Sequence, residues 1–446
     1  MTAPYHEAVD VKEKDLALET QVGDSEIPQH VLDDIKLHSA TIYWSLFFLE
    51  GSVMWAFYSC LSAQDYYAST FPNVQFAFLT TPILTWPLSL GHIIQMWFGL
   101  DRALGNMNRV YIGYGLFAAC GIFILVQGQL GLEEFTGATL VLLCFGLVGA
   151  AHSLTEPAYY NVASLFPDEK FTNAIQVGNV VAGCINVTAA TLIHWAVSGA
   201  KDSDGGVKLS FYIFMSLLLV VCVGAVIVYY RLEKIPCVRY LLDRAAADHN
   251  KHGKVSLPTL WAKFFRVAKV IVMPMIAQFM LFFCTLTLFP GFGISSVLKF
   301  KTVMSSSGGP WVISPGIIAP FNFGDLIGRV LSTKSAVKMF SLRFCFFFSF
   351  FRWVWLPLLL LGTATNSLYS FGDSEWSAYA FQVVLYVILG ITGGLFSTIT
   401  IGMGPLLVRQ EDREAAAALM VMFLFLGLSC GSTFGWVIGH NHWFGL

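Results

Sequence analysis

The chain has 446 residues, of which 56% are hydrophobic and only 12% are charged, about half the charged share of a typical soluble protein. Together with a mean hydropathy of +0.66, this is more apolar surface than one aqueous core can bury, so a water-soluble protein is excluded and we expect most of the surface to face lipid. The net charge of −2 provides no basic field, so nucleic acid is not an expected partner.

The cysteines and glycines carry no signature of a bound metal or cofactor. Eight of the nine cysteines lie in apolar runs and Cys237 lies in a basic connection, which argues against a disulfide framework or a zinc ribbon. The chain has no glycine-rich phosphate loop that ends in Lys-Ser or Lys-Thr. We therefore expect no metal, no cofactor and no ATP hydrolysis.

Residues 1–40 are polar and contain nine acidic side chains but only three lysines. They lack the basic and then apolar order of a signal peptide. The composition predicts a disordered cytosolic tail.

Apolar runs long enough to cross a bilayer follow one another through the rest of the chain. Their uniform hydrophobicity indicates helices, since barrel strands would alternate. The sequence thus predicts an all-α membrane protein with eleven transmembrane helices, at 41–63, 75–99, 109–130, 136–158, 174–198, 209–230, 267–290, 311–333, 341–362, 380–405 and 414–438.

The distribution of Lys and Arg predicts the orientation. With the N-terminus inside, nineteen of these residues fall on the cytoplasmic side and four on the other side. This bias favours a cytoplasmic N-terminus and an extracellular C-terminus. The longest connection is the basic cytoplasmic loop 231–266. It separates a first bundle of six helices (41–230) from a second bundle of five helices (267–446). We expect a short amphipathic helix at the headgroups within this loop.

The eighth run contains the clearest polar constellation. Asn322, Asp325 and Arg329 follow the spacing i, i+3, i+7, which places them on one stripe of a helix, and Asp325 can pair with Arg329. Gly324 and Gly328 beside them permit close packing of another helix or close approach of a ligand. This stripe has two interpretations. The ion pair either fixes the register of the helix, or the three groups bind a polyhydroxylated ligand. A guanidinium, a carboxylate and an amide together provide the donors and acceptors that a sugar needs.

Three further ionisable residues within the predicted spans are candidates for the functional site. Glu50 in the first helix is a candidate substrate contact, proton carrier or buried carboxylic acid. His152 and Glu156, at i, i+4 in the fourth helix, are too few for a metal site and are interpreted as substrate contacts or as an interhelical hydrogen bond. The pairs His92 with Gln95 and Gln176 with Asn179 are expected to serve packing only.

Several dispersed motifs resemble one family, the equilibrative nucleoside transporters. The string FNFGDLIGR, residues 321–329, is similar to that family's F-N-x-x-D-x-x-G-R signature. The resemblance runs from the first helix to the last, and its other matches are Trp55 with Phe57, Gly178 with Ala182-Gly183, Thr285-Leu286 with Phe289-Pro290, Arg352 with Pro357-Leu358, Arg413-Glu414-Ala415 and Gly427-Leu428.

The resemblance implies roles for individual residues. Asp325 and Arg329 would hold the ribose hydroxyls, and Phe321 and Asn322 would line the same cavity. Trp55 would form an aromatic wall for the base, Glu156 would face the base edge, and Ser59 and Pro290 would form part of the external gate. Glu50 and His152 remain possible proton-linked residues.

The resemblance also implies the fold and the activity. We expect a 6+5, major-facilitator-like arrangement that moves nucleosides, in particular purine nucleosides such as adenosine, down their gradient by alternating access. The expected partners are the nucleoside substrate and the bilayer, the expected location is the plasma membrane, and a monomer is expected to function. The alternatives are a proton-coupled symporter for nucleosides or nucleobases, and an intramembrane enzyme that uses His152 and Glu156 as acid and base.

Overall fold

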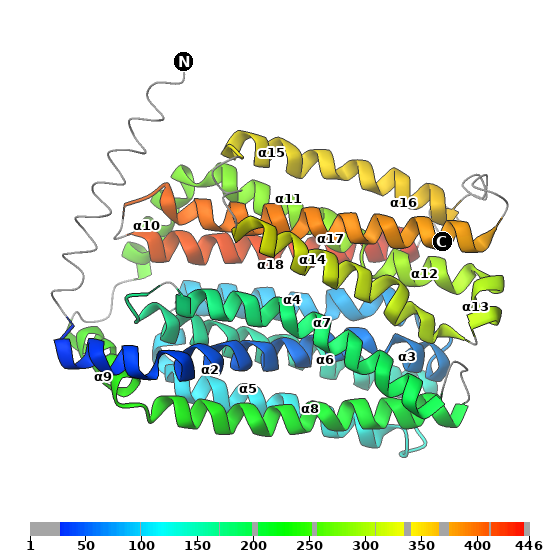
Figure 1. Cartoon of the computed structure of the whole chain (residues 1–446), viewed down its shortest axis with the longest axis horizontal. Coiled ribbons are helices and arrows are strands. Elements are labelled where there is room, and N and C mark those ends of the chain that lie inside the picture. The colour runs from blue at the N-terminus through cyan, green and yellow to red at the C-terminus, as the bar shows by residue number, and fades with distance from the viewer. Residues whose placement is uncertain are drawn as a thin grey trace.

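The computed structural model describes residues 27–98, 100–168, 170–198, 204–251, 257–307, 309–333, 340–364, 374–409 and 412–440. All regular secondary structure in these ranges is helical, which confirms the predicted class (Figure 1). The first half of the chain forms α2 (Gln29–Ser62), α3 (Gln64–Thr70), α4 (Phe76–Phe98), α5 (Leu100–Gln127), α6 (Glu134–Ser164), α7 (Lys170–Ser198), α8 (Asp204–Glu233) and α9 (Pro236–Lys251).

The second half contains several interrupted helices. Its elements are α10 (Leu257–Val270), α11 (Val272–Leu288), α12 (Gly291–Lys299), α13 (Lys301–Ser307), the 3-10 turn η2 (Pro310–Val312), the π-turn η3 (Ser314–Ile318), α14 (Ala319–Thr333), α15 (Leu342–Phe351), the 3-10 turn η5 (Arg352–Val354), α16 (Trp355–Ala364), α17 (Glu375–Leu406) and α18 (Arg413–His440). The seventh, eighth and ninth predicted runs each fall on more than one of these elements.

Within the described residues, nine helices are long and apolar enough to cross a membrane. The first and eighth predicted spans are not among them. Glu50 and the Ser, Trp and Tyr residues near it lower the hydropathy of α2, and α14 has only 15 residues because η3 precedes it. The count of eleven spans therefore stays a prediction.

The N-terminal part of α2 corrects the expectation of disorder up to residue 40. Residues 29–40 are helical, whereas residues 1–26 lie outside the described ranges. Val31 and Ile35 are buried, and the backbone N–H of Cys237 in α9 donates to Asp34 at 2.9 Å. Contacts with α9, 203 residues away in the chain, thus stabilise this segment as a helix.

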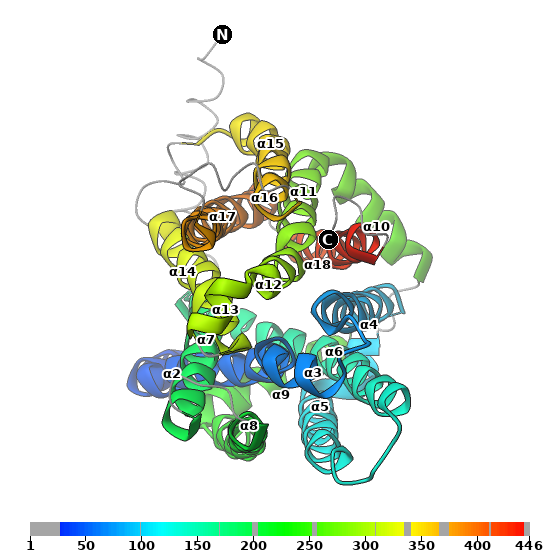
Figure 2. The same cartoon turned by 90° about the vertical axis from the view of Figure 1, so that its right-hand side faces the viewer.

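The helices of the two halves lie on opposite sides of a seam (Figure 2). Most buried apolar residues of α2 to α9 share one large core, which Phe425 of α18 joins, whereas most of those after residue 270 form smaller cores, one of which includes Val187 of α7. Across the seam, α4 packs on α18 and α7 packs on α14.

Hydroxyl groups line the α4–α18 contact. Ser89 and Ser429 share a hydrogen bond of 2.6 Å, and the indole of Trp86 donates to Thr433 at 2.8 Å. Small polar side chains of this kind allow two helices in lipid to approach closely and to bond to each other.

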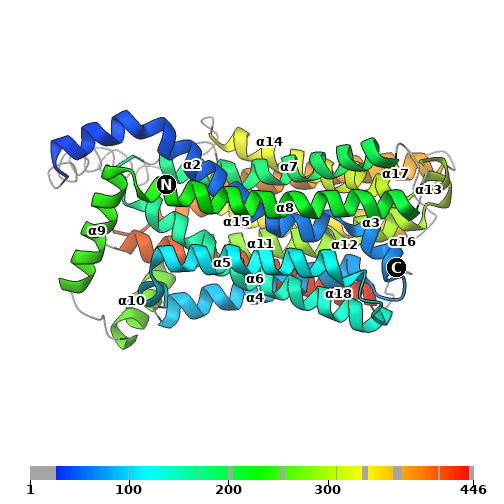
Figure 3. The ribbon, with the colours of Figure 1, turned by 90° about the horizontal axis from the view of Figure 1, so that it is seen from below.

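The basic loop folds into two helices rather than one short helix. Figure 3 shows α9 and α10 together at one end of the long axis of the molecule. Arg266 of α10 donates to Asp412 just before α18 at 2.9 Å, and the ring of Trp261 contacts that of Trp97 at the end of α4. Helix α10 therefore contacts both halves of the protein.

Candidate functional site

The predicted ion pair on α14 forms within one turn of the helix. The Nε of Arg329 donates to Oδ2 of Asp325 at 2.9 Å. The side chains of Arg329 and Asp325 are 29% and 18% exposed, so both are mostly buried but remain partly accessible. A mostly buried pair in a spanning helix is costly unless it is satisfied, which makes it a candidate site rather than a surface contact.

Four glycines set the position of this pair by bringing α14 against α17. A Cβ added at Gly324 would lie 2.5 Å from the carbonyl oxygen of Val387, and one added at Gly328 would lie 2.7 Å from the backbone nitrogen of Leu395. On α17, Gly394 faces the backbone and side chain of Asp325, and Gly390 faces the carbonyl of Phe321. The two backbones therefore touch directly beside the ion pair.

The neighbouring residues of the signature make packing contacts. The amide of Asn322 is buried and donates to the carbonyl of Gly183 in α7 at 3.3 Å, across the seam. The ring of Phe321 stacks on Phe289 with centroids 3.9 Å apart. Both residues lie beside the ion pair along α14, as the spacing predicted.

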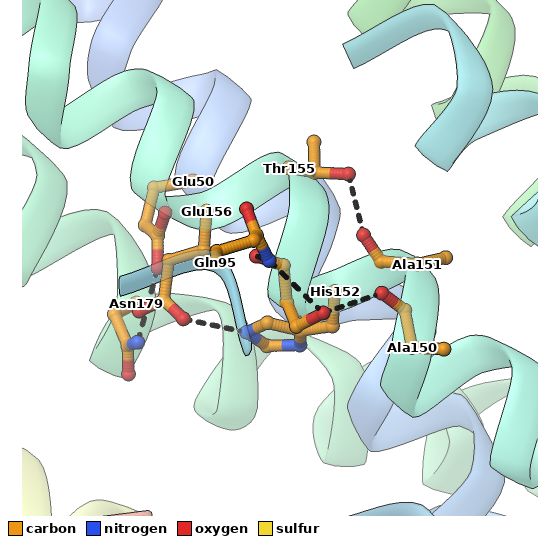
Figure 4. A network of polar contacts seen from close by, with 9 residues as sticks. Glu50, Gln95, Ala150, Ala151, His152, Thr155, Glu156 and Asn179 are labelled. Carbon is orange, nitrogen blue, oxygen red and sulfur yellow. Dashed lines mark hydrogen bonds and ion pairs between the residues drawn. The ribbon is translucent and has the colours of Figure 1, made fainter. Parts of the chain in front are cut away.

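A second polar cluster lies in the first half of the chain (Figure 4). Nδ2 of Asn179 in α7 donates to Oε1 of Glu50 in α2 at 3.1 Å. On α6, the Nε2 of His152 lies 2.9 Å from Oε2 of Glu156, so the i, i+4 pair forms. Glu50 and His152 are almost completely buried, and Glu156 is 8% exposed.

The two carboxyl groups of this cluster face each other. Glu50 interacts electrostatically with Glu156, and its Oε2 has no hydrogen-bond partner among the described residues. Two buried carboxyl groups that face each other offer several acceptor oxygens to a ligand with hydrogen-bond donors. Asn179, which the sequence analysis assigned to packing, is part of this cluster.

Two tyrosines lie between the clusters. Arg329 interacts electrostatically with the phenol groups of Tyr58 in α2 and Tyr160 in α6. Neither residue was singled out from the sequence, although Tyr160 stands at i+4 from Glu156. Their position connects the α14 ion pair to the Glu50–Glu156 cluster.

The structure gives the following surroundings for the three candidates of the base wall and the gate. The ring of Trp55 packs against Phe214 of α8, with centroids 6.3 Å apart. Ser59 accepts from Asn186 at 3.3 Å, whereas Pro290 lines a small cavity with residues of α4 and α18. The base wall and the gate therefore stay predictions.

Within the described ranges, no group of three or more His, Cys, Asp or Glu residues could hold a metal ion. The polar groups on each side of the seam are donors and acceptors for a hydrogen-bonding ligand. Polar groups near the contact of two helical halves are typical of polytopic membrane transporters.

Comparison with known proteins identifies the family. The family profile described as "Nucleoside transporter" matches residues 142–440, and the chain belongs to this family. Among its relatives, the equilibrative nucleotide transporter 6 of Arabidopsis thaliana is 23% identical, with 85% of this chain and 90% of that protein covered. The equilibrative nucleoside transporter 3 of Rattus norvegicus is 22% identical, with 76% and 72% covered.

Solved structures support the fold. A D-xylose-proton symporter superposes with a TM-score of 0.58 at 13% identity, covering 90% of this chain and 92% of the other. The nucleoside transporter NupG gives 0.51 at 14% identity, covering 90% and 91%. The xylose symporter XylE, described as a major facilitator superfamily protein, gives 0.53 at 14% identity, covering 91% and 90%. The fold is therefore major-facilitator-like.

Membership in this family determines the general activity. The protein is a multi-pass membrane transporter of the equilibrative nucleoside transporter family and not an enzyme, so the interpretation of His152 and Glu156 as an acid and base pair is wrong. Their hydrogen bond lies inside a transporter helix bundle instead.

Proposed function

We propose that the protein is a facilitative transporter that moves purine nucleosides such as adenosine down their gradient by alternating access. The Asp325–Arg329 pair is the observation that carries this proposal, because its atoms are partly accessible at a site where few charges are tolerated. The carboxylate accepts hydrogen bonds from ribose hydroxyls, and the guanidinium donates to their oxygens.

The second cluster suits the base. A purine edge presents N–H donors and ring-nitrogen acceptors, and Glu156 accepts from the donors when ionised and can also donate when protonated. Aromatic side chains such as Trp55 and Phe321 offer apolar faces for a flat base. A neutral nucleoside requires no compensating charge, so a concentration gradient is sufficient to drive it.

Movement of the two halves about the seam would expose the site to each side in turn. The largely distinct cores of the halves and the hydroxyl contacts between α4 and α18 support such rocking. We extend the proposal to eleven spans, a cytoplasmic N-terminus, an extracellular C-terminus, a functional monomer and residence in the plasma membrane.

Uptake into proteoliposomes tests the proposal. Purified protein should equilibrate labelled adenosine across the bilayer without any ion gradient, and the recovered nucleoside should be unchanged. In cells, Asp325→Ala and Arg329→Ala should each abolish uptake of labelled adenosine although the variant protein still reaches the cell surface. Normal uptake by either variant would refute the ribose assignment.

The Glu50–Glu156–His152 cluster favours a second candidate function, proton-coupled symport of nucleosides or nucleobases. A carboxyl pair that shares a proton can take up and release that proton as the halves move. An imposed proton gradient should then drive accumulation above equilibrium, and Glu50→Gln should abolish accumulation. A facilitator keeps its initial rate when the proton gradient is clamped to zero.

A further inference from the structure

Tyr58 and Tyr160 stand on the first half of the protein and face charges on both halves. The charged group that interacts most strongly with Tyr58 is Asp325, followed by Arg329. For Tyr160 the strongest interactions are with Glu50 and Glu156, followed by Arg329. Tyr58 is therefore associated mainly with the α14 ion pair, and Tyr160 mainly with the carboxyl cluster.

The packing of α7 fixes the position of Tyr58. A Cβ added at Gly183 would lie 2.8 Å from Cζ and 3.1 Å from the hydroxyl oxygen of Tyr58, so glycine is needed for this approach. The carbonyl of the same Gly183 accepts from Asn322, which is one turn before Asp325 on α14. The phenol thus stands where α2, α7 and α14 meet.

Helix geometry directs Tyr160 toward the carboxyl cluster. It lies at i+4 from Glu156, on the same face of α6. The preceding residue, Tyr159, points to α5 instead, where its hydroxyl donates to that of Tyr114 at 3.0 Å. Two adjacent tyrosines on one helix therefore have separate roles.

The hydroxyl groups of Tyr58 and Tyr160 have free hydrogen-bonding capacity. Both side chains are only partly buried, and in the part of the chain that the structure describes neither hydroxyl makes a hydrogen bond to protein. The buried Tyr114, Tyr159 and Tyr386 all bond through their hydroxyls. A phenol both donates and accepts, which complements acceptor-only carboxylates and a donor-only guanidinium.

We propose that Tyr58 and Tyr160 are substrate-contacting residues that determine specificity, with Tyr58 reading the ribose hydroxyls and Tyr160 reading the edge of the base. This inference rests on the proposed function and extends the site to both sides of the seam. Each hydroxyl completes the hydrogen bonding of the substrate next to a charged group, and each ring covers apolar substrate surface.

Single-oxygen deletions test the assignment. The variants are Tyr58→Phe and Tyr160→Phe, with Tyr159→Phe as the matched control on the same helix. Uptake of labelled adenosine, corrected for surface protein, is measured in competition with 2′-deoxyadenosine, 3′-deoxyadenosine and inosine. A variant that is absent from the surface is compared by competition binding to purified protein.

We expect Tyr58→Phe to reduce the preference for adenosine over the deoxynucleosides several-fold and to leave the ratio of adenosine to inosine unchanged. Tyr160→Phe should change the ratio of adenosine to inosine and leave ribose dependence unchanged. Tyr159→Phe should change neither ratio.

Substrate rankings in Tyr58→Phe and Tyr160→Phe that equal those of the wild type would overturn the inference, as would equal changes in the Tyr159→Phe control. Failure of the wild-type protein to transport any nucleoside would instead overturn the proposed function. The two failures are therefore distinguishable.

Discussion

Arg352 in η5 is a fully buried cation that joins helices of the second half. Its Nη1 donates to the carbonyl of Leu281 and the hydroxyl of Thr285, each at 3.0 Å, and its Nη2 donates to the carbonyl of Leu389 at 2.9 Å. The guanidinium fork satisfies three acceptors on α11 and α17 at once. This geometry indicates a role in stability rather than in substrate contact.

Replacement of Arg352 with leucine should lower stability substantially. It removes three hydrogen bonds donated by a charged group, which contribute about 1.5–3 kcal/mol each, while the carbonyls of Leu281 and Leu389 keep hydroxyl donors from their own helices. The temperature at which detergent-solubilised protein loses its monodisperse elution peak should fall clearly below the wild-type value. Arg343→Leu on the exposed face of α15 is the control and should have little effect. Equal thermal stability of Arg352→Leu and wild type would contradict this role.

Arg329 should not tolerate lysine, although the charge is conserved. An ammonium is a point charge that cannot bond to Asp325 and to a ribose with the planar geometry of a guanidinium. Hydrogen bonds to charged groups contribute about 1.5–3 kcal/mol, so transport efficiency should fall about tenfold or more. Initial uptake rates at several adenosine concentrations measure this, and unchanged efficiency would show that only the charge matters.

The sequence could predict side-chain pairs that lie about one helix turn apart, and the glycines of α14 indicated that another helix could approach, but the sequence did not identify partners from distant segments. Asp325 with Arg329 and His152 with Glu156 were found because i, i+4 spacing depends on helix geometry alone. Asn179 bonds to Glu50 across 129 residues, a pairing that exists only once α2 and α7 have packed. Tyr58 and Tyr160 were missed for the same reason.

Among the helical elements, α14 shows where span prediction reaches its limit. Hydropathy predicted one run at 311–333, but the structure divides it into η2, η3 and α14. Pro310, Pro315 and Pro320 lie in or beside these turns, and each lacks the N–H that a regular helix uses. A hydropathy scale does not detect the missing backbone N–H of a proline. The apolar run was therefore predicted, whereas the interruption of the helix was not.

The contact between α14 and α17 should depend on the size of its glycines. Gly328→Ala would place a methyl group against the backbone of α17 at Ile391 and Leu395, where no flexible side chain can yield. Overpacking of this kind costs about 1–3 kcal/mol and would move Asp325 and Arg329 away from their places. We expect reduced thermal stability and reduced adenosine uptake.

Gly402→Ala is the matched control for this interface. An added Cβ there meets nothing within 4 Å, although the residue lies on the same helix, α17. Wild-type behaviour of Gly402→Ala together with loss in Gly328→Ala supports the close contact. Equal behaviour of the two variants would show that the helices are not pressed together at Gly328.

At the scale of the whole molecule, composition was sufficient to predict an all-helical membrane protein, because apolar surface and run length follow from the sequence directly. The division of the helices between two sides of a seam depends on packing between distant segments, for example α4 on α18. The orientation of the bundle in the membrane follows from Lys and Arg placement and stays a prediction.

Epitope accessibility tests that orientation. A tag at the N-terminus should bind antibody only after cells are permeabilised, whereas a tag at the C-terminus should bind antibody on intact cells. The physical reason is the bias of nineteen to four basic residues toward the cytoplasmic side. Both tags accessible from the same side would contradict an odd number of spans.

The central claim is that Asp325 and Arg329 hold the ribose of a transported nucleoside, and one ratio tests it most directly. Uptake of adenosine is compared with uptake of 2′,3′-dideoxyadenosine in the wild type and in Asp325→Asn, which keeps the side-chain shape and removes the charge. The wild type should prefer adenosine about tenfold or more, because hydrogen bonds to a charged group contribute about 1.5–3 kcal/mol. Asp325→Asn should lose most of this preference, and an undiminished preference in that variant would contradict the account.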